Sequence, residues 1–568
     1  MEEKESMRVL ARITAAEQWR DSRYADLWQD CYRRYRSQPK RQREGSNLFV
    51  PHTFMQCEVI KARLCESLFS QRPYLAALPR ESNDAARAQK MQTLLDWQLN
   101  ERMDLPRLLG ERVIANLVIY GTGITYTGWQ VKRRRMRQAI AESQPLADAA
   151  GRPYLDENGQ ALELPRQRVI ERLVTLYDDP LVADIALSDF FCDPLAEDIE
   201  GARFCGHCEL MTREALQALA EEGKYSIDWE KLPPAAGAAT RGRTQEEADC
   251  FAAGEDKELH LVHHYWEDAR HLVFLDRCQC ICEEENPFWH GMKPYDKCCY
   301  VPLPGEFYGM GVPEILAGLQ DELNTSRNQR IDYNSLSLRR MWKLRRGCGL
   351  TARDLVWRQN GVLQVENMDD VQEIDLQSLP ADAFANESSV KQDMQDATGC
   401  HDILMGIAYS NETATTTMTR DNNASLRFKA AVRMLVKDLL VPIARKCAAM
   451  DQQFLSGSRV VRLLGSEQPE ALFSIDPAEI NGDYDVIYCG AAVESMANQE
   501  LNKERALQAY SLALADPAYQ NDDLARLKLF RKVLASLGLT EGDDLLPACR
   551  WPAAAADSGF AQQPAAGI

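Results

Sequence analysis

The stretch "PEILAGLQDELNTSRNQRIDYNSLSLRRMWKL", residues 313–344, predicts a long helix. Pro313 stands at its start, where a helix needs no backbone donor. Residues 324–330 are polar on all sides, and a helix that is polar all round needs neighbours, solvent or a copy of itself. We therefore expect several copies of the chain to assemble around it. The apolar stripe before the polar part has helical spacing: Ile315, Leu316, Leu319 and Leu323.

The second half of this helix opens a basic region in an acidic chain. Between residues 327 and 358 only Asp332 and Asp354 oppose the basic residues. The bland interpretation is a solvated face or an acidic protein partner, and the sharper one is transient phosphate contact. A second cluster, "KRRRMR", occupies residues 132–137. The basic residues of the region are Arg327, Arg330, Arg339, Arg340, Lys343, Arg345, Arg346, Arg353 and Arg358.

Downstream, the pattern predicts short strands at 347–375, a second helix at 380–405 and a third at 419–455 that Pro442 should kink. Between the last two lies "YSNETATTTMTR", residues 409–420, with hardly an apolar anchor. Such a loop costs conformational entropy to order, so something should hold it or pass by it.

The part before the long helix alternates helices with strands, which predicts an α+β, helix-rich fold. Helices are expected at 1–44, 54–69, 83–102, 105–119 and 212–221, the last with Thr212 as N-cap. Residues 138–168 look like an irregular hairpin or insertion, and strands are expected at 172–178, 183–194, 259–268, 271–284, 297–305 and 484–490. Residues 233–255 read as a surface loop, and two further helices at 496–514 and 521–537 precede a low-complexity tail.

Composition excludes several classes of protein. The 568 residues exceed one hydrophobic core, and 45% hydrophobic residues are typical of a folded chain. The absence of a run of 18 apolar residues argues against a membrane span, and the charged N-terminus lacks the apolar core of a signal peptide, so we expect an intracellular chain. A DNA-clamping protein would be basic, whereas the net charge is −19, so any DNA contact should be local or weak.

Glycine and histidine motifs favour structure over catalysis. "GTGITYTG", residues 121–128, follows a helix and opens a strand, the reverse of a phosphate loop. His263 and His264 fall on opposite faces of a predicted strand and cannot both serve one small site. Neither a local catalytic triad nor a paired-acid arrangement stands out, so we assign no catalytic residue, no metal ligand and no cofactor.

The 17 cysteines favour structural thiols. "CGHC", with Cys205, His207 and Cys208, could suggest zinc, but its Cys-x-x-Cys pair lacks the matching second pair that a strong zinc site would have. The same alternative applies to "CQCIC" with Cys298 and Cys299. Its Cys278, Cys280 and Cys282 alternate and should share one strand face, which suits packing as well as metal.

Several blocks, in order, carry a family resemblance over residues 45–500. They include "GSNLFVPHTFMQCEVIKARLCESLFSQRPY", "VIYGTGITYTGW", "LSDFFCDPLAEDIEGARFCGH", "FYGMGVPEILAGLQDELNTSRNQRID", "QNGVLQVEN" and "DATGCHDILMGI". The chain resembles the portal (head-to-tail connector) proteins of tailed bacteriophages. It departs from them in its cysteine content, in the Ala/Gly insertion at 233–255 and in a short C-terminal region.

The resemblance implies a subunit with wing, stem, clip and crown regions around a ring channel. Its order would be an N-terminal helical, basic segment (1–44), wing (45–311), stem helix (312–345), clip (346–379), second stem helix (380–405) and tunnel loop (406–420). A tunnel helix with a return to the wing (421–495), crown helices (496–545) and a disordered tail (546–568) would follow.

The resemblance also implies function, partners and location. The ring, usually of about twelve subunits, would occupy one capsid vertex of the virion, after assembly in the host cytoplasm, and pass double-stranded DNA during packaging and ejection. Partners would be further copies of the chain, the terminase large subunit, a head–tail adaptor, and the major capsid and scaffolding proteins, with no membrane.

Two groups of residues would serve this function. The tunnel loop would line the DNA channel with Tyr409, Ser410, Asn411, Thr413, Thr415, Thr416, Thr417 and Thr419. The clip and stem would present Arg339, Arg340, Lys343, Arg345, Arg346, Arg353 and Arg358.

Two other functions stay open at this point. A different ring-forming head–tail adaptor is one, although adaptors are usually smaller and lack two stem helices. A nucleic-acid-processing enzyme is the other, and it would need clustered acids for metal or a phosphate loop. The leading interpretation is a non-enzymatic DNA conduit and assembly platform.

Overall fold

The computed structural model describes residues 3–40, 45–70, 72–81, 84–145, 163–231, 259–267, 269–338, 341–346, 371–374, 382–400, 427–457, 459–462 and 472–489, with single residues between 351 and 369 and between 507 and 533. Contacts divide the chain into Met1–Glu412 with Leu426–Ala492, and Thr413–Ser425 with Val493–Ile568. In the second unit the rings of Tyr510 and Phe530 lie 5.6 Å apart. Everything below concerns the first unit.

A five-stranded antiparallel sheet forms one core. It contains, in spatial order, β4 (Phe190–Cys192), β5 (Phe204–Thr212), β6 (Leu259–Glu267), β7 (Arg270–Leu275) and β8 (Gln279–Glu285). The helix α7 (Arg213–Glu221) follows β5, and Thr212 caps it by accepting a hydrogen bond from the Ala215 amide at 3.3 Å, as predicted. Leu216 of α7 packs with Val262 and Val273 on one face of the sheet.

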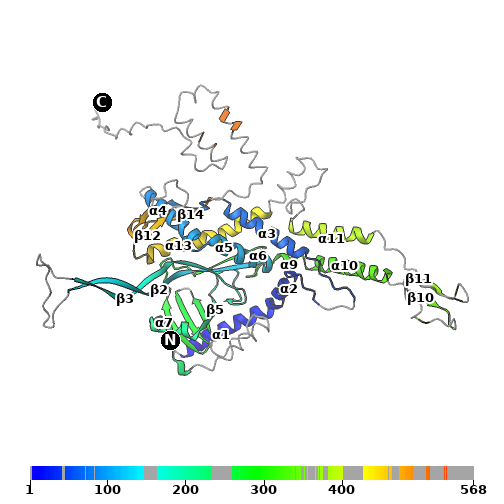
Figure 1. Ribbon diagram of the computed structural model, residues 1–568, viewed down its shortest axis with the longest axis horizontal. Coiled ribbons are helices and arrows are strands. Elements are labelled where there is room, and N and C mark those ends of the chain that lie inside the picture. The colour runs from blue at the N-terminus through cyan, green and yellow to red at the C-terminus, as the bar shows by residue number, and fades with distance from the viewer. Residues whose placement is uncertain are drawn as a thin grey trace, which may run out of the picture. The chain divides into compact units, whose positions relative to one another are not determined.

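The N-terminal helix α1 (Glu3–Arg20) covers the other face of this sheet (Figure 1). A π-helical turn (Asp21–Ala25) and α2 (Asp26–Tyr35) follow it, and α2 packs against other helices. Val9 and Ile13 of α1 pack against Tyr265 and Phe274 of the sheet. Helix was expected here, but Arg20 and Arg34 are buried rather than part of a solvated basic face. Arg20 donates to the Phe190 carbonyl at 2.7 Å, and Arg34 to both oxygens of Asp321.

A second sheet has the order β3-β2-β9, with β2 (Thr122–Pro145), β3 (Glu163–Asp184) and β9 (Tyr295–Cys299). A hairpin was expected at 138–168 and is confirmed, but its described part is regular and not irregular. Gln138 pairs with Ile170 and Pro145 with Glu163 in an unbroken antiparallel register. Each strand completes the other's backbone hydrogen bonds, a pairing that polar composition alone does not reveal. Residues 146–162 lie outside the described residues.

The glycine turn at 121 closes a helix, as its sequence order predicted. The helix α6 (Ile114–Tyr120) ends at Gly121, whose φ of 85° is left-handed. A Cβ atom there would lie 2.2 Å from the Gly309 carbonyl oxygen, so only glycine fits. The glycine therefore serves close packing between two chain segments.

A helical layer and two two-stranded sheets complete the body. The predicted helices appear as α3 (His52–Phe69), α4 (Ala85–Trp97) with a π-helical extension (Gln98–Arg102), α5 (Leu105–Leu108) with a π-helical turn (Leu109–Val113), then α6. The short pairs are β1 (Leu75–Pro79) with β14 (Tyr484–Tyr488), and β12 (Arg459–Arg462) with β13 (Leu472–Ile475). Short 3-10 turns span Trp229–Lys231 and Pro477–Glu479.

The predicted third helix is described from residue 427. It runs through a π-helical turn (Val436–Leu440) into α13 (Val441–Phe454). Pro442 stands directly after the turn, because a proline cannot donate the regular hydrogen bond and the backbone widens locally instead.

The long helix quoted first is shorter than predicted. It forms α9 (Val312–Ile315) and α10 (Ala317–Leu338), and Met341–Leu344 is the strand β10 instead of helix. At 1.5 Å per residue α10 spans about 33 Å. The strand forms because β11 (Val371–Ile374) pairs with it, Met341 opposite Ile374. The second helix, α11 (Asp382–Thr398), also ends before the expected 405, at Gly399 with φ 72°.

Candidate functional site: a helix pair with a basic hairpin

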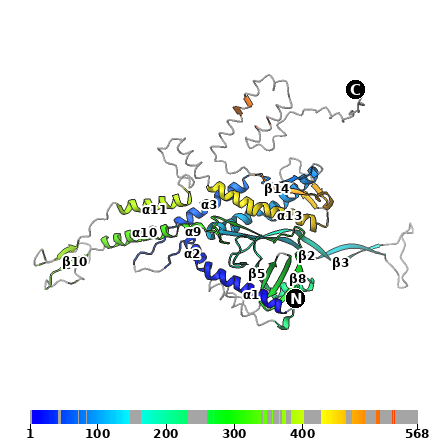
Figure 2. The same ribbon diagram turned by 180° about the vertical axis from the view of Figure 1, so that it is seen from behind.

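The helices α10 and α11 lie side by side, and β10 with β11 follows at their far end (Figures 1 and 2). Charges join the two helices. Glu387 of α11, with a side chain only 7% exposed, pairs with Arg327 and with Arg330 at 2.8 Å. Lys391 adds a third cation at 3.0 Å. Two members of the predicted basic region are thus neutralised by an acid that lies 57 residues or more away in sequence.

The pKa of Glu387 reflects this cluster. Burial opposes its ionisation, but hydrogen bonds from Arg327 and Lys391 outweigh that effect. The pKa of Glu387 therefore lies below its ordinary value, and the carboxylate stays charged at neutral pH.

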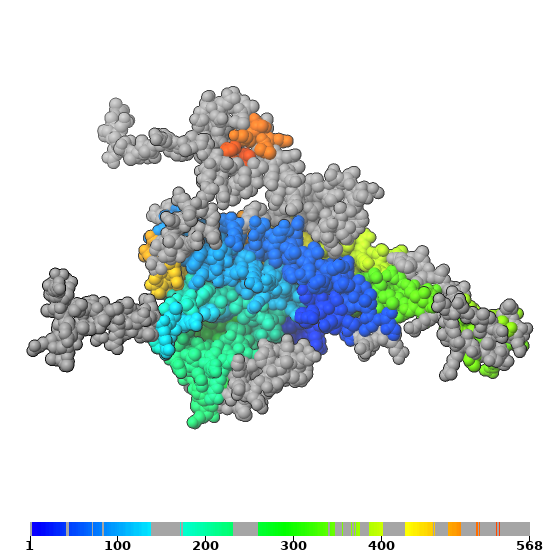
Figure 3. All heavy atoms as spheres, viewed as in Figure 1, coloured from blue at the N-terminus to red at the C-terminus, as the bar shows by residue number. Residues whose placement is uncertain are grey.

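The polar middle of α10 holds a strap formed by residues 45–53. Asn324 accepts from the Val50 amide at 2.9 Å, and Asn328 both accepts from the Leu48 amide at 2.7 Å and donates to the Leu48 carbonyl at 2.9 Å. In the space-filling view the blue N-terminal part of the chain borders the green α10 (Figure 3). Polar groups that suggested symmetric copies thus have partners within one chain.

The strap fits along the helix because the spacing of its backbone amides nearly matches the spacing of side chains on α10. Four helical residues rise about 6 Å and two extended residues about 6.6 Å, so every fourth side chain of the helix meets every second amide of the strap. The repeat continues at one end, where Asp332 accepts from the Ser46 amide at 2.6 Å. At the other end Gln320 accepts from the amide of Thr53, in the first turn of α3, at 3.1 Å.

The structure places only part of the predicted basic group. Lys343 lies on β10 opposite Gln372 and is exposed, and Arg345 and Arg346 follow it, also exposed. The other four members lie outside the described residues: Arg339, Arg340, Arg353 and Arg358. The described part of the hairpin thus presents three exposed basic side chains, whereas Arg327 pairs with the buried Glu387.

The predicted tunnel loop, residues 406–420, lies outside the described residues. Its members are Tyr409, Ser410, Asn411, Thr413, Thr415, Thr416, Thr417 and Thr419. The same holds for the tail and for most of the helices expected between 496 and 537.

The described cysteines are free thiols. Burial raises the pKa of Cys192 and Cys205 has 0% exposure, as structural thiols should. The shared face expected for Cys280 and Cys282 is wrong, because a β-bulge beside Val273 turns Cys280 toward the α1 side and Cys282 toward the α7 side. Cys278 lies in the turn before the strand.

Sequence reasoning missed a histidine cluster on the α7 face of the five-stranded sheet. His207 of β5 stacks on His264 of β6 with centroids 4.8 Å apart, and His264 stacks on His271 of β7 at 5.5 Å. His263 points the other way, 3.5 Å from Glu17 of α1, as its alternation predicted. His264 and His271 lie on consecutive strands, but His207 lies 57 residues before His264, so only the shared strand parity could have indicated the cluster.

Burial lowers the pKa values of two histidines in this cluster. Burial lowers the pKa of His207 well below its ordinary value, and the neighbouring His264, His271 and His263 lower it further. Burial also lowers the pKa of His271, although the hydrogen bond that His271 donates to Glu284 acts in the opposite direction. Burial therefore favours the neutral imidazole of His207 and of His271 at neutral pH.

A second missed site is a pair of buried acids between three elements. Gln98 donates to Asp451 of α13 at 2.8 Å, while Arg102 pairs with Asp179 of β3 at 2.9 Å. Burial raises the pKa of Asp451 to about 8; Gln98 lowers it, Asp179 raises it and Arg459 lowers it. This carboxyl is therefore protonated at neutral pH.

The described residues contain no helix with the length and apolar character that a membrane crossing requires. A comparison with models of known protein families matches residues 8–550 to the phage SU10 portal protein. The match covers both the helix pair with its hairpin and the sheets of the body. The chain therefore belongs to the phage SU10 portal protein family, as its sequence resemblance to tailed-phage portal proteins predicted.

Proposed function

We propose that this chain forms a closed ring, usually of about twelve subunits, at one vertex of a phage capsid. DNA enters and leaves the head through its channel, and the protein acts as a conduit and platform rather than as an enzyme. The observation that carries this proposal is the family match over residues 8–550.

The regions of the subunit follow the helix pair. We assign α9 and α10 with α11 to the stem, the hairpin of β10 and β11 to the clip, and residues 45–311 to the wing. The clip then starts at Met341 and not at 346, because β10 starts there. Residues 406–420 form the tunnel loop, 421–495 the tunnel helix with its return to the wing, and 496–545 the crown.

The chemistry of the tunnel loop suits a channel wall. Its Thr and Asn side chains offer hydroxyl and amide contacts to phosphates without the tight ion pairing that Lys or Arg would add. The net charge of −19 favours movement for the same reason, since an acidic wall repels DNA.

The clip is the proposed docking surface for the terminase large subunit and, later, the head–tail adaptor. Exposed Lys343, Arg345 and Arg346 support this role, since exposed charges steer association more than they stabilise a fold. The wing faces the major capsid and scaffolding proteins in this assignment.

Electron-microscopy class averages of the purified chain test the ring. We expect a closed ring with a central opening and rotational symmetry. A strictly monomeric species at high protein concentration, measured by light scattering, would overturn the proposal.

Packaging by variant rings tests the tunnel loop. Thr415→Lys with Thr416→Lys adds positive charge at the channel and should slow DNA, with strong salt dependence. Glycine at both positions should loosen the loop and let packaged DNA slip. Ser22→Lys, an exposed change in the π-helical turn after α1, is the control and should package as the parent does. Ring assembly of each variant is checked first. If both loop variants then package and hold DNA as the parent does, the loop does not line the channel.

A further inference from the structure

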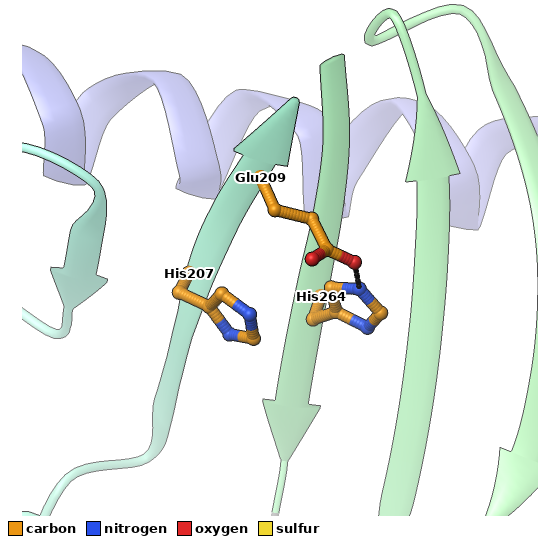
Figure 4. Close-up of side chains that lie close together, drawn as sticks. All are labelled: His207, Glu209 and His264. Atoms are coloured by element: carbon orange, nitrogen blue, oxygen red, sulfur yellow. Dashed lines mark hydrogen bonds and ion pairs between the residues drawn. The ribbon is translucent and has the colours of Figure 1, made fainter. Parts of the chain in front are cut away.

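The α7 face of the five-stranded sheet brings together three metal-binding side chains. His207 and Glu209 stand two residues apart on β5 and so project from the same face. His264 on β6 pairs directly with His207. One ligand atom from each of the three lies within 4.8 Å of the others. Figure 4 shows the three side chains converging, with Glu209 and His264 in contact.

We propose that His207, Glu209 and His264 bind one divalent transition-metal ion of the zinc class. Two neutral imidazoles and one carboxylate are the ligand set that such ions accept, with a fourth position left for water. The site joins β5 to β6 beside the start of α7, and it is independent of the proposed portal function.

The partners of the imidazoles select the coordinating nitrogens. Nδ1 of His207 lies 2.7 Å from the Tyr295 hydroxyl, which leaves Nε2 to coordinate. Nδ1 of His264 lies 3.3 Å from His271 Nε2, which leaves its Nε2 toward Glu209, 3.0 Å away. Metal-binding histidines in proteins have such outer partners, which fix the tautomer.

Outer contacts hold the second imidazole in place. Glu209, His264, His271 and Glu284 form three successive contacts, the last of 2.7 Å between His271 Nδ1 and Glu284. His271 thus holds the His264 ring from the side opposite Glu209, as outer partners do for metal-binding histidines.

A metal ion can reach the proposed site from solvent, and the ligand side chains can move to meet it. The side chain of Glu209 is 44% exposed and that of His264 13%, so an ion reaches the site from solvent. His207 is only 8% exposed and forms the rigid end of the site. Ligand atoms around zinc lie about 3.4 Å apart at bond lengths near 2.1 Å, so small side-chain movements bring the three ligands to coordination distance.

Titration of the chelator-treated full-length chain with Zn²⁺ and with Co²⁺ tests the site. We expect one tight equivalent per chain by calorimetry. The Co²⁺ complex should show visible d–d absorption of four-coordinate nitrogen and oxygen ligands, without the near-ultraviolet charge-transfer band of a thiolate. That band separates this site from the exposed Cys278 and from the other cysteines.

Variants assign the ligands. Glu209→Gln and His264→Gln should each weaken binding by more than the roughly 10- to 100-fold typical of losing an outer-shell partner, and Glu284→Gln should fall within that range. His290→Gln, whose histidine lies outside the cluster and accepts from the Met292 amide, should bind as the parent does. Circular dichroism confirms that each variant is folded.

Two results would overturn the proposal. One is the absence of a saturable equivalent in the parent. The other is equal affinity in Glu209→Gln, His264→Gln and the parent, or a thiolate band that persists in all of them, since the metal would then bind elsewhere. Loss of ring assembly in the parent would count against the proposed function and not against the metal site.

Discussion

The five-stranded sheet buries its large apolar side chains, whereas the tip of the helix pair leaves them exposed. In the sheet, Phe274 and Tyr265 have 0% exposure. At the end of the helix pair, Leu338 is 84% exposed and Met341 62%. The body thus supplies the burial that stabilises the fold, because hydrophobic stabilisation scales with the apolar area removed from water. The tip contributes little burial, and its side chains are available to other molecules.

The middle of α10 is a third case between these two. Its side chains are polar, yet they have partners within the chain: the strap and Glu387. The polar residues therefore fall into two groups, those whose paired side chains stabilise the fold and those whose exposed charges contribute little to it. The following changes test that separation, from the largest expected effect to the smallest.

Phe274→Ala should produce the largest loss. Removing a fully buried aromatic side chain leaves a cavity and costs about 3–5 kcal/mol of unfolding free energy. Leu338→Ala at the tip is the matched control and should stay within about 0.5 kcal/mol of the parent. Denaturant unfolding measures the unfolding free energy of both variants. An equal loss of unfolding free energy in the two variants would mean that the tip contributes to stability as much as the sheet does.

Asp451→Asn should change how stability depends on pH. The pKa of Asp451 in the folded chain is about 8, above its unfolded value, so the folded state binds the extra proton. Stability from this group is present below the unfolded pKa and is lost as pH rises toward 8, by at most about 1.4 kcal/mol per pH unit. Asparagine keeps the acceptor for Gln98 and cannot ionise.

The measurement is unfolding free energy between pH 6 and 8 for both proteins. The parent should lose stability over this window relative to Asp451→Asn, and the difference should grow with pH. Parallel curves would mean that Asp451 does not bind a proton in the folded chain.

Asn328→Ala should release the strap at one point. It removes two hydrogen bonds with the Leu48 backbone, each worth about 1 kcal/mol. Limited proteolysis should cut near residues 45–50 faster than in the parent. Asn334→Ala, an exposed change on the same helix, should leave the cleavage rate unchanged. If both variants resist cleavage equally, these hydrogen bonds do not hold the strap.

Charge reversal at the clip should have the smallest effect on stability. Changing Arg339, Arg340, Lys343, Arg345 and Arg346 to Glu should cost under about 1 kcal/mol for each exposed pair, while docking or DNA retention falls. Reversal of Arg327 and Arg330 is the comparison and should destabilise more, because Glu387 would then be buried among like charges. A clip variant that fails to fold or to form rings would show that these residues are structural.

Much of the local structure followed from the sequence. Periodicity predicted the helices of the body and most of α10, the Thr212 cap and the Pro313 start appeared as expected, and Gly121 closed α6. These signals are local, since capping, φ preference and helical spacing depend on residues within a few positions of one another. The family resemblance was also readable, because it rests on short blocks in a fixed order.

Only the tertiary structure decided which polar groups meet. Glu387 neutralises Arg327 from 60 residues away, and Asn328 binds Leu48 from 280 residues away. His207, His264 and His271 share one sheet face through strand register, and a single bulge separates Cys280 from Cys282. Partners set by register and helix packing leave no local pattern, because the chain's own spacing says nothing about which distant segment completes a hydrogen bond. The sequence by itself therefore determined the elements and the family, whereas the fold decided which charges are neutralised and which remain exposed.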